Sequence, residues 1–326
     1  MRILFAGTPE VAVKPLQALA SAGGGMEVVA VLTRPDAPQG RGRRLAPSPV
    51  KAAAMELGLP VIEDKPTSDG FFEAVARFKP DIAAVVAYGS ILRQPALDAV
   101  PLGWFNLHFS LLPQYRGAAP VQRAIWAGET VTGATVFKIG PGLDNGPVAA
   151  QSTVEIGAHE TSGELLGRLS EDGSNLLCAA LKGIADGRLS LAEQPEGVFE
   201  PAPKIHPDDA RIRFDVPAFA ADRQIRACTP EPGAWCLLHN RTETDAQGAE
   251  GGIKLTVARA HPDMSDDPQK PAGLRPGMIA VSKKHVWIGT LTDPLELDQV
   301  KQQGKKQMAA ADWARGARLP EGAYCD

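Results

Sequence analysis

Residues 1–32, MRILFAGTPEVAVKPLQALASAGGGMEVVAVL, contain two kinds of apolar pattern. The run from Arg2 to Ala6 is continuous, as in a strand that is covered on both faces, whereas Val11–Leu19 places its apolar residues at helical spacing. Gly23–Gly25 end this helix, and Val28–Leu32 is a second continuous run. The stretch therefore predicts a strand–helix–strand unit with two parallel strands.

The same alternation continues through the first half of the chain. Further strands are expected at residues 59–62, 81–87, 104–108 and 134–139, and further helices at 71–78 and 162–186. Continuous rather than alternating apolar runs indicate a mostly parallel sheet with helices on both faces. The fold class expected for this half is α/β, with a Rossmann-like doubly wound sheet.

The pattern of apolar and polar residues changes near residue 187. Several prolines interrupt a polar stretch, and the short apolar segments beyond it are separated by turn-rich sequence. We therefore predict an α/β domain at 1–188, a linker at 189–206 and a small OB-like β-barrel at 207–326.

Composition excludes several classes of protein. The chain has 326 residues, a net charge of −4, and four cysteines that form no Cys-x-x-Cys pair, so neither a disulfide framework nor a metal site is expected. No apolar run approaches the ~20 residues of a membrane helix, and we expect a soluble, cytoplasmic protein. The first turn, Ala6–Glu10, lacks the Gly-x-Gly-x-x-Gly pattern of dinucleotide-binding proteins, and no Walker-type motif is present.

Polar residues cluster where the strand at 104–108 ends. Asn106 and His108 are two positions apart, so an extended strand points both side chains the same way. An amide and an imidazole that converge can donate to an oxyanion and move a proton. Asp144 lies in a glycine-flanked turn after the next strand. Without a Ser or Cys nucleophile, the set suits direct attack of an amine on an activated acyl or formyl group; alternatively, these residues only satisfy backbone hydrogen bonds.

The stretch 106–126, NLHFSLLPQYRGAAPVQRAIW, resembles the signature of the 10-formyltetrahydrofolate-dependent formyltransferases. Similar segments follow the family's order along the chain, and they lie at residues 6–9, 34–36, 40–42, 48–51, 85–89, 143–147, 204–205, 210–212 and 230–235. The likeness therefore covers most of the chain, with the strongest agreement in residues 1–190.

The resemblance implies roles for particular residues. The catalytic trio of the family matches Asn106, His108 and Asp144, with Asn and His stabilising the oxyanion and Asp orienting the His and helping to remove the amine proton. The positions that match the pocket of the co-substrate, 10-formyltetrahydrofolate, are Ser110, Leu111, Leu112, Pro113, Val86, Ala87, Tyr88 and Gly89.

The loop at 34–51 carries five basic residues (Arg34, Arg41, Arg43, Arg44 and Lys51) and one acid, Asp36. It resembles the loop that wedges the acceptor stem in family members that formylate initiator methionyl-tRNA. We therefore expect Arg41 at the acceptor end, and Arg43 and Arg44 on phosphates. Lys305 and Lys306 form a second basic cluster that can follow the RNA backbone. The partners expected are initiator methionyl-tRNA and the folate, with the chain acting as a monomer and without a tightly bound metal.

Other readings stay open at this point. A formyltransferase of an amino sugar nucleotide shares much of this architecture, and a formyltetrahydrofolate hydrolase would use water in place of the amine. A ribonucleotide acceptor fits the basic loop and the second domain less well. A tRNA-binding protein without activity would not need the trio.

Overall fold

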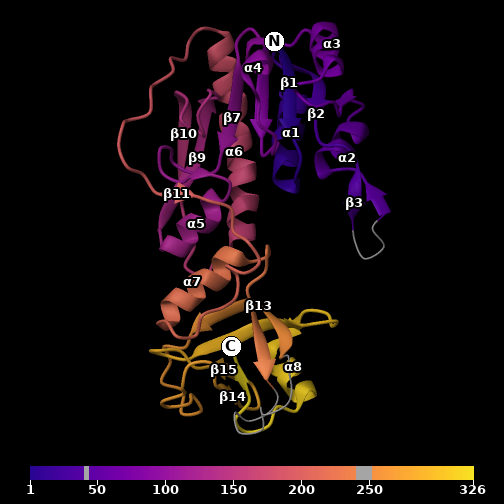
Figure 1. The fold of residues 1–326 in the computed structure, drawn as a ribbon. Coiled ribbons are helices and arrows are strands. Elements are labelled where there is room, and N and C mark those ends of the chain that lie inside the picture. The colour runs from indigo at the N-terminus through magenta and orange to yellow at the C-terminus, as the bar shows by residue number, and fades with distance from the viewer. Residues whose placement is uncertain (40–43, 240–251) are drawn as a thin grey trace. The chain divides into compact units, whose positions relative to one another are not determined.

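The computed structural model describes residues 1–39, 44–239 and 252–326. The chain forms two compact units (Figure 1). The first unit contains Met1–Pro120, Val131–Glu155 and Leu166–Ala202, and the second contains Val121–Thr130, Ile156–Leu165 and Pro203–Asp326. The domain limits expected at residues 188 and 206 stay a prediction.

A seven-stranded sheet forms the centre of the first unit, with the order β10-β9-β7-β6-β1-β2-β5 among the described residues (Figure 1). Its strands are β1 (Arg2–Gly7), β2 (Glu27–Leu32), β5 (Val61–Ile62), β6 (Ile82–Val86), β7 (Trp104–His108), β9 (Val131–Lys138) and β10 (Val148–Glu155). The five strands from β7 to β5 are parallel, whereas β9 and β10 add an antiparallel edge. The expected α/β class with a mostly parallel sheet is confirmed.

Helices cover both faces of this sheet, because its central strands are apolar on both sides. The helices of this part of the chain are α1 (Val13–Ser21), α2 (Pro49–Glu56), α3 (Asp69–Phe78), α4 (Gln94–Asp98) and α6 (Ser162–Ala185), with a 3₁₀ turn at Glu10–Ala12. Phe71 of α3 and Ala96 of α4 share a buried cluster with Leu4 and Trp104. On the other face, Gly173 of α6 lies against Leu107.

The second unit contains an antiparallel sheet with the order β14-β15-β16-β13-β12-β18, while β17 pairs with β16. The strands are β12 (Trp235–His239), β13 (Ile253–Pro262), β14 (Ile279–Val281), β15 (Val286–Ile288), β16 (Leu295–Gln302), β17 (Met308–Ala309) and β18 (Tyr324–Cys325). A bridge between Met278 and Tyr324 brings the two ends of this sheet together, so it forms a nearly closed barrel, as expected. The helices of this unit are α5 (Pro120–Ala127), whose first residue belongs to the first unit, α7 (Ala218–Cys228) and α8 (Ala310–Ala317).

None of the helices in the described part of the chain combines the length and the hydrophobicity that a membrane-spanning segment needs.

Candidate active site

Strand β7 places Asn106 and His108 at the carboxyl end of the parallel sheet. Asn106 pairs with Val85 of β6 and with Phe137 of β9, so its backbone is fixed from both sides. Strand alternation puts its half-buried side chain on the same face as that of His108, as expected. Within the described part of the chain, the Asn106 amide makes no hydrogen bond to another residue. The amide is therefore available to donate to a bound molecule.

His108 is a buried imidazole whose contacts suit the neutral form. Its Nε2 lies 2.9 Å from the carbonyl oxygen of Tyr115, and only an N–H can bond to that oxygen. Burial lowers the pKa of His108, and the Asp144 carboxylate and the Tyr115 carbonyl oppose this shift. Nδ1 therefore keeps its lone pair and can accept a proton.

Asp144 faces His108 from the turn between β9 and β10. Its Oδ2 lies 3.9 Å from Nδ1 of His108 and accepts a hydrogen bond of 2.9 Å from the backbone N–H of Gly117. Asp144 has a left-handed backbone with φ of 48°. The structure thus brings His108 and Asp144 together across residues far apart in the chain, and the carboxylate can stabilise a protonated imidazole.

The loop Ser110–Pro113, expected at the folate pocket, is attached to the antiparallel edge of the sheet. Thr135 of β9 donates from its hydroxyl to the carbonyl of Ser110 (2.7 Å) and accepts from the N–H of Leu112 (3.1 Å). Gln151 of β10 donates to the carbonyl of Leu112 at 2.9 Å. Ser110 is fully buried, and its hydroxyl donates to the carbonyl of Gln114. The backbone of this loop is therefore held in place, whereas Leu111 is partly exposed.

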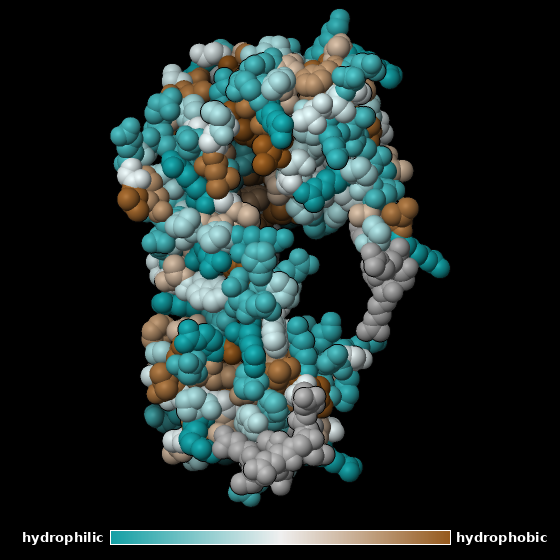
Figure 2. Space-filling view, viewed as in Figure 1, coloured by the Kyte–Doolittle hydropathy of each residue, from teal (hydrophilic) through white to brown (hydrophobic). Residues whose placement is uncertain are grey.

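The segment Val86–Gly89, expected to form the other wall, follows β6. Val86 and Tyr88 are buried, whereas Ala87 and Gly89 are exposed. Tyr88 packs in the cluster under α3 and α4, and burial raises the pKa of its hydroxyl. The guanidinium of Arg34 donates to the carbonyl of Gly89. Figure 2 shows hydrophobic side chains around a hollow in the first unit.

The basic loop is described only in part. It forms a hairpin of β3 (Ala37–Gln39) and β4 (Arg44–Ala46), while Arg41 and Arg43 lie outside the described residues. Arg44 is exposed, and within the described residues it forms no ion pair.

Two of the basic residues counted in this loop have structural partners instead. Arg34 bonds to Gly89, and Lys51 pairs with Asp36 at 2.6 Å and with Glu63 at 2.9 Å. In the second unit, Lys305 and Lys306 are exposed in the turn between β16 and β17.

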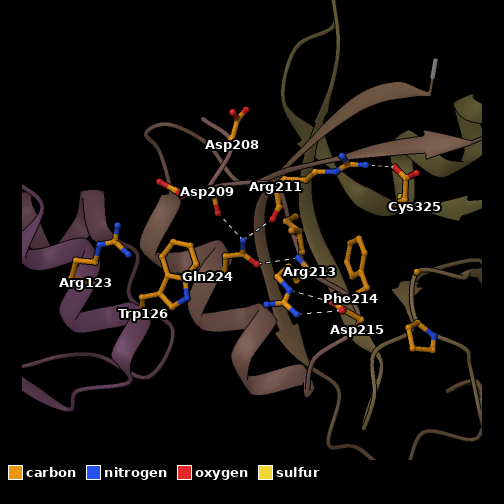
Figure 3. A pocket seen from close by; sticks show the side chains of 14 residues that line it. Arg123, Trp126, Asp208, Asp209, Arg211, Arg213, Phe214, Asp215, Gln224 and Cys325 are labelled. Carbon is orange, nitrogen blue, oxygen red and sulfur yellow. Dashed lines mark hydrogen bonds and ion pairs between the residues drawn. The ribbon is translucent and has the colours of Figure 1, made fainter. Parts of the chain in front are cut away.

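A cavity of about 670 Å³ lies in the second unit, at α7 and the C-terminus. Four of its charged groups form two pairs, because Arg211 bonds to Asp326 at 2.9 Å and Arg213 to Asp215 at 3.2 Å (Figure 3). Gln224 binds backbone groups that also line this cavity. None of the sequence-predicted site residues belongs to its lining. The described residues contain no group of three or more His, Cys, Asp or Glu side chains suited to a metal ion.

Comparison with known proteins identifies the family of this chain. The family model described as formyl transferase matches residues 1–181, and that of the formyl transferase C-terminal domain matches residues 204–318. The chain belongs to the formyl transferase family. It is 62% identical to a methionyl-tRNA formyltransferase of Bifidobacterium adolescentis over 100% of both chains. It is 49% identical to that of Mycobacterium avium, over 98% of this chain and 97% of the relative.

The fold of this formyl transferase also occurs in more distant proteins. A variant of HypX from Aquifex aeolicus matches with a TM-score of 0.66 and 17% identity, over 98% of this chain and 50% of that one. At this identity, the match speaks for the fold alone.

Further residues hold the candidate site in place. Gln194, which lies in the expected linker, donates to the carbonyls of Asp144 and Gly146. Tyr115 and Gly117 supply backbone groups to His108 and Asp144. No motif marks these residues, because Tyr115 and Gly117 contribute only backbone groups, and Gln194 contributes a single side-chain amide from a stretch without a recognisable pattern. Only the position of Tyr115 and Gly117 inside the signature stretch could have drawn attention to them.

Proposed function

We propose that this protein transfers the formyl group of 10-formyltetrahydrofolate to the α-amino group of methionine on initiator methionyl-tRNA. The observation that carries this conclusion is the 62% identity, over the full length of both chains, to a methionyl-tRNA formyltransferase. An amino sugar nucleotide as acceptor gains no such full-length support, and a hydrolase would not need the exposed cation Arg44 in the loop at 34–51.

Asn106, His108 and Asp144 are the residues that we assign to the reaction. The amine nitrogen attacks the formyl carbon, and the carbonyl oxygen gains negative charge that the Asn106 amide can stabilise by hydrogen bonding. The amine loses a proton as the new C–N bond forms. His108 can accept it at Nδ1, where the Asp144 carboxylate, 3.9 Å away, stabilises the imidazolium. The bond from the formyl carbon to the folate nitrogen then breaks, and this nitrogen receives the proton.

The donor site in this proposal lies between the loop Ser110–Pro113 and the segment Val86–Gly89. Both follow strands that adjoin at the carboxyl edge of the sheet, which is where open α/β sheets bind their ligands. The hydrophobic hollow in the first unit suits a planar pteridine ring (Figure 2).

Basic residues from both units are assigned to the tRNA. Arg41 would contact the acceptor end, Arg43 and Arg44 would contact phosphates, and Lys305 and Lys306 would follow the RNA backbone. The exposure of Arg44, Lys305 and Lys306 supports this role, since an ion pair with a phosphate needs a solvated cation. A monomer that works in the cytoplasm, where initiator tRNA is used, is part of the same proposal.

The test is incubation of the protein with 10-formyltetrahydrofolate and methionyl-tRNA, with initiator and elongator tRNA in parallel. Mass spectrometry of the released amino acid is expected to show one added formyl group on the initiator sample. Formylation of an amino sugar nucleotide, with unmodified methionine on both tRNAs, would overturn the acceptor. Release of free formate without any acceptor would indicate a hydrolase.

A further inference from the structure

Gln194 uses its whole hydrogen-bonding capacity at the edge of the candidate active site. Its Nε2 donates to the carbonyls of Asp144 (2.9 Å) and Gly146 (2.8 Å). Its Oε1 accepts from Nε (3.0 Å) and Nη2 (2.6 Å) of Arg116. A side-chain amide has two N–H groups and one oxygen with two lone pairs, so all four positions are filled.

These bonds close a ring of contacts around the Asp144 carboxylate. Arg116 precedes Gly117, whose N–H donates to Oδ2 of Asp144 at 2.9 Å. Gln194 therefore connects the backbone of Asp144 to the segment that also binds its side chain. The ring of Phe199 lies 5.8 Å from the Arg116 guanidinium and adds a second contact from the same stretch of chain.

The turn that carries Asp144 needs such support. Asp144 has φ of 48°, a left-handed conformation that costs free energy in a residue with a side chain. The carbonyls of Asp144 and Gly146 would otherwise depend on water for their hydrogen bonds. Gln194 binds both, so it favours the one backbone path that directs the carboxylate at His108.

We propose that Gln194 is a positioning residue that holds the Asp144 carboxylate at His108. This role rests on the proposed function of the site. Within the described part of the chain, Gln194 makes no hydrogen bond to His108, and it acts through the Asp144 turn. The stretch that the sequence marks as a linker is thereby part of the catalytic machinery.

The test compares two variants. Gln194→Met keeps the length and volume of the side chain and removes all four hydrogen bonds. A displacement of a catalytic group by about 1 Å costs about 100-fold in rate, so we expect kcat to fall about 10- to 100-fold while both KM values change less than about twofold. Gln194→Glu keeps the acceptors for Arg116 and removes the donors to both carbonyls, so kcat should fall there as well.

The pKa of His108 provides a readout that does not depend on turnover. The Asp144 carboxylate raises this pKa, and the Tyr115 carbonyl acts in the same direction. If Asp144 moves away in Gln194→Met, the pKa of His108 measured by NMR titration should fall. A merely structural role would lower the melting temperature and leave this pKa unchanged.

Gln94→Met serves as the matched control, because Gln94 bonds to Asp98 on the exposed face of α4 in the same unit. It should leave kcat and the His108 pKa unchanged. A wild-type kcat in folded Gln194→Met, or an unshifted His108 pKa, would overturn the positioning role. If the wild-type protein does not formylate methionyl-tRNA, the proposed function fails, while the titration still decides whether Gln194 holds Asp144.

Discussion

At the level of single residues, protonation of His108 should set the lower pH limit of activity. Burial lowers the pKa of His108 below the ordinary value of about 6.5, and the nearby Asp144 carboxylate opposes this only in part. We expect kcat to be constant from about pH 8 down to about pH 6.5 and to fall at lower pH, because the protonated ring cannot accept the amine proton.

Asp144→Asn should move the fall in kcat to lower pH. Burial lowers the pKa of His108, and in this variant the carboxylate charge no longer opposes that effect. The measurement is kcat against pH for both proteins. If kcat instead began to fall at a higher pH in the variant than in wild type, the result would contradict the contact between Asp144 and His108.

The lowered pKa of His108 also makes the stability of the folded chain depend on pH. Because burial lowers the pKa of His108 in the folded chain, the unfolded chain binds more protons as the pH falls below about 6.5. The contribution of His108 to stability is therefore present above about pH 6.5 and is lost as the pH falls through its folded pKa. Urea unfolding of wild type and His108→Gln at pH 7.5 and 5.5 checks this sign. The stability of wild type should decrease more between the two pH values than that of the variant.

Asn106→Asp should distinguish the effect of the Asn106 side-chain N–H on catalysis from the effect of the side chain's size. Aspartate has nearly the same size as asparagine but no N–H, and it places negative charge where the oxyanion forms. Loss of one such donor costs about 100- to 1,000-fold in kcat, with KM values little changed. Steady-state kinetics with both substrates varied in turn provides the measurement. A change confined to the KM of the folate would instead place Asn106 in donor binding.

Part of this site follows from the sequence and part does not. The alternation of a strand predicts that Asn106 and His108 share a face, and the structure confirms it. The approach of Asp144 to His108 depends on a left-handed turn and on Gln194, 50 residues further along the chain. No local pattern encodes such contacts, so the sequence linked Asp144 to the other two only by its glycine-flanked turn after a strand, by the chemistry of the set and by the family resemblance.

Among the secondary-structure elements of the first unit, the strands with continuous apolar runs were predicted, whereas its alternating edge strand was not. β6 is buried along its whole length and was predicted, whereas β10 alternates between half-buried and exposed positions and was missed. The sequence of an edge strand with one solvated face resembles the sequence of a polar loop. β10 nevertheless matters to the site, because its Gln151 holds the loop after β7.

Strand β9 supports that loop through one hydroxyl, which gives an element-level prediction. Thr135→Val removes the bonds to the carbonyl of Ser110 and the N–H of Leu112 and leaves two buried backbone groups without this partner. Such a loss costs about 1–3 kcal/mol, and the KM for the folate should rise several-fold because the loop shapes its site. Thr132→Val on the same strand is the control, since within the described residues the hydroxyl of this largely buried residue makes no hydrogen bond.

Denaturant unfolding and folate KM values of the two variants provide the comparison. Equal effects of Thr135→Val and Thr132→Val would show that the loop does not depend on the Thr135 hydroxyl.

For the molecule as a whole, tRNA binding is assigned to cations from both compact units, so its salt dependence should report on each. Every phosphate contact adds about 0.7–0.9 to the slope of log K against log salt concentration. Lys305→Gln with Lys306→Gln should therefore lower this slope by about 1–2 and weaken tRNA binding, while the KM for the folate stays the same.

Lys283→Gln with Lys284→Gln is the matched control, because these two lysines occupy another exposed turn of the same barrel. Arg44→Gln tests the first unit in the same way. If the control pair changes the slope as much as the Lys305 and Lys306 pair, the barrel attracts RNA by its overall charge and not through a defined surface.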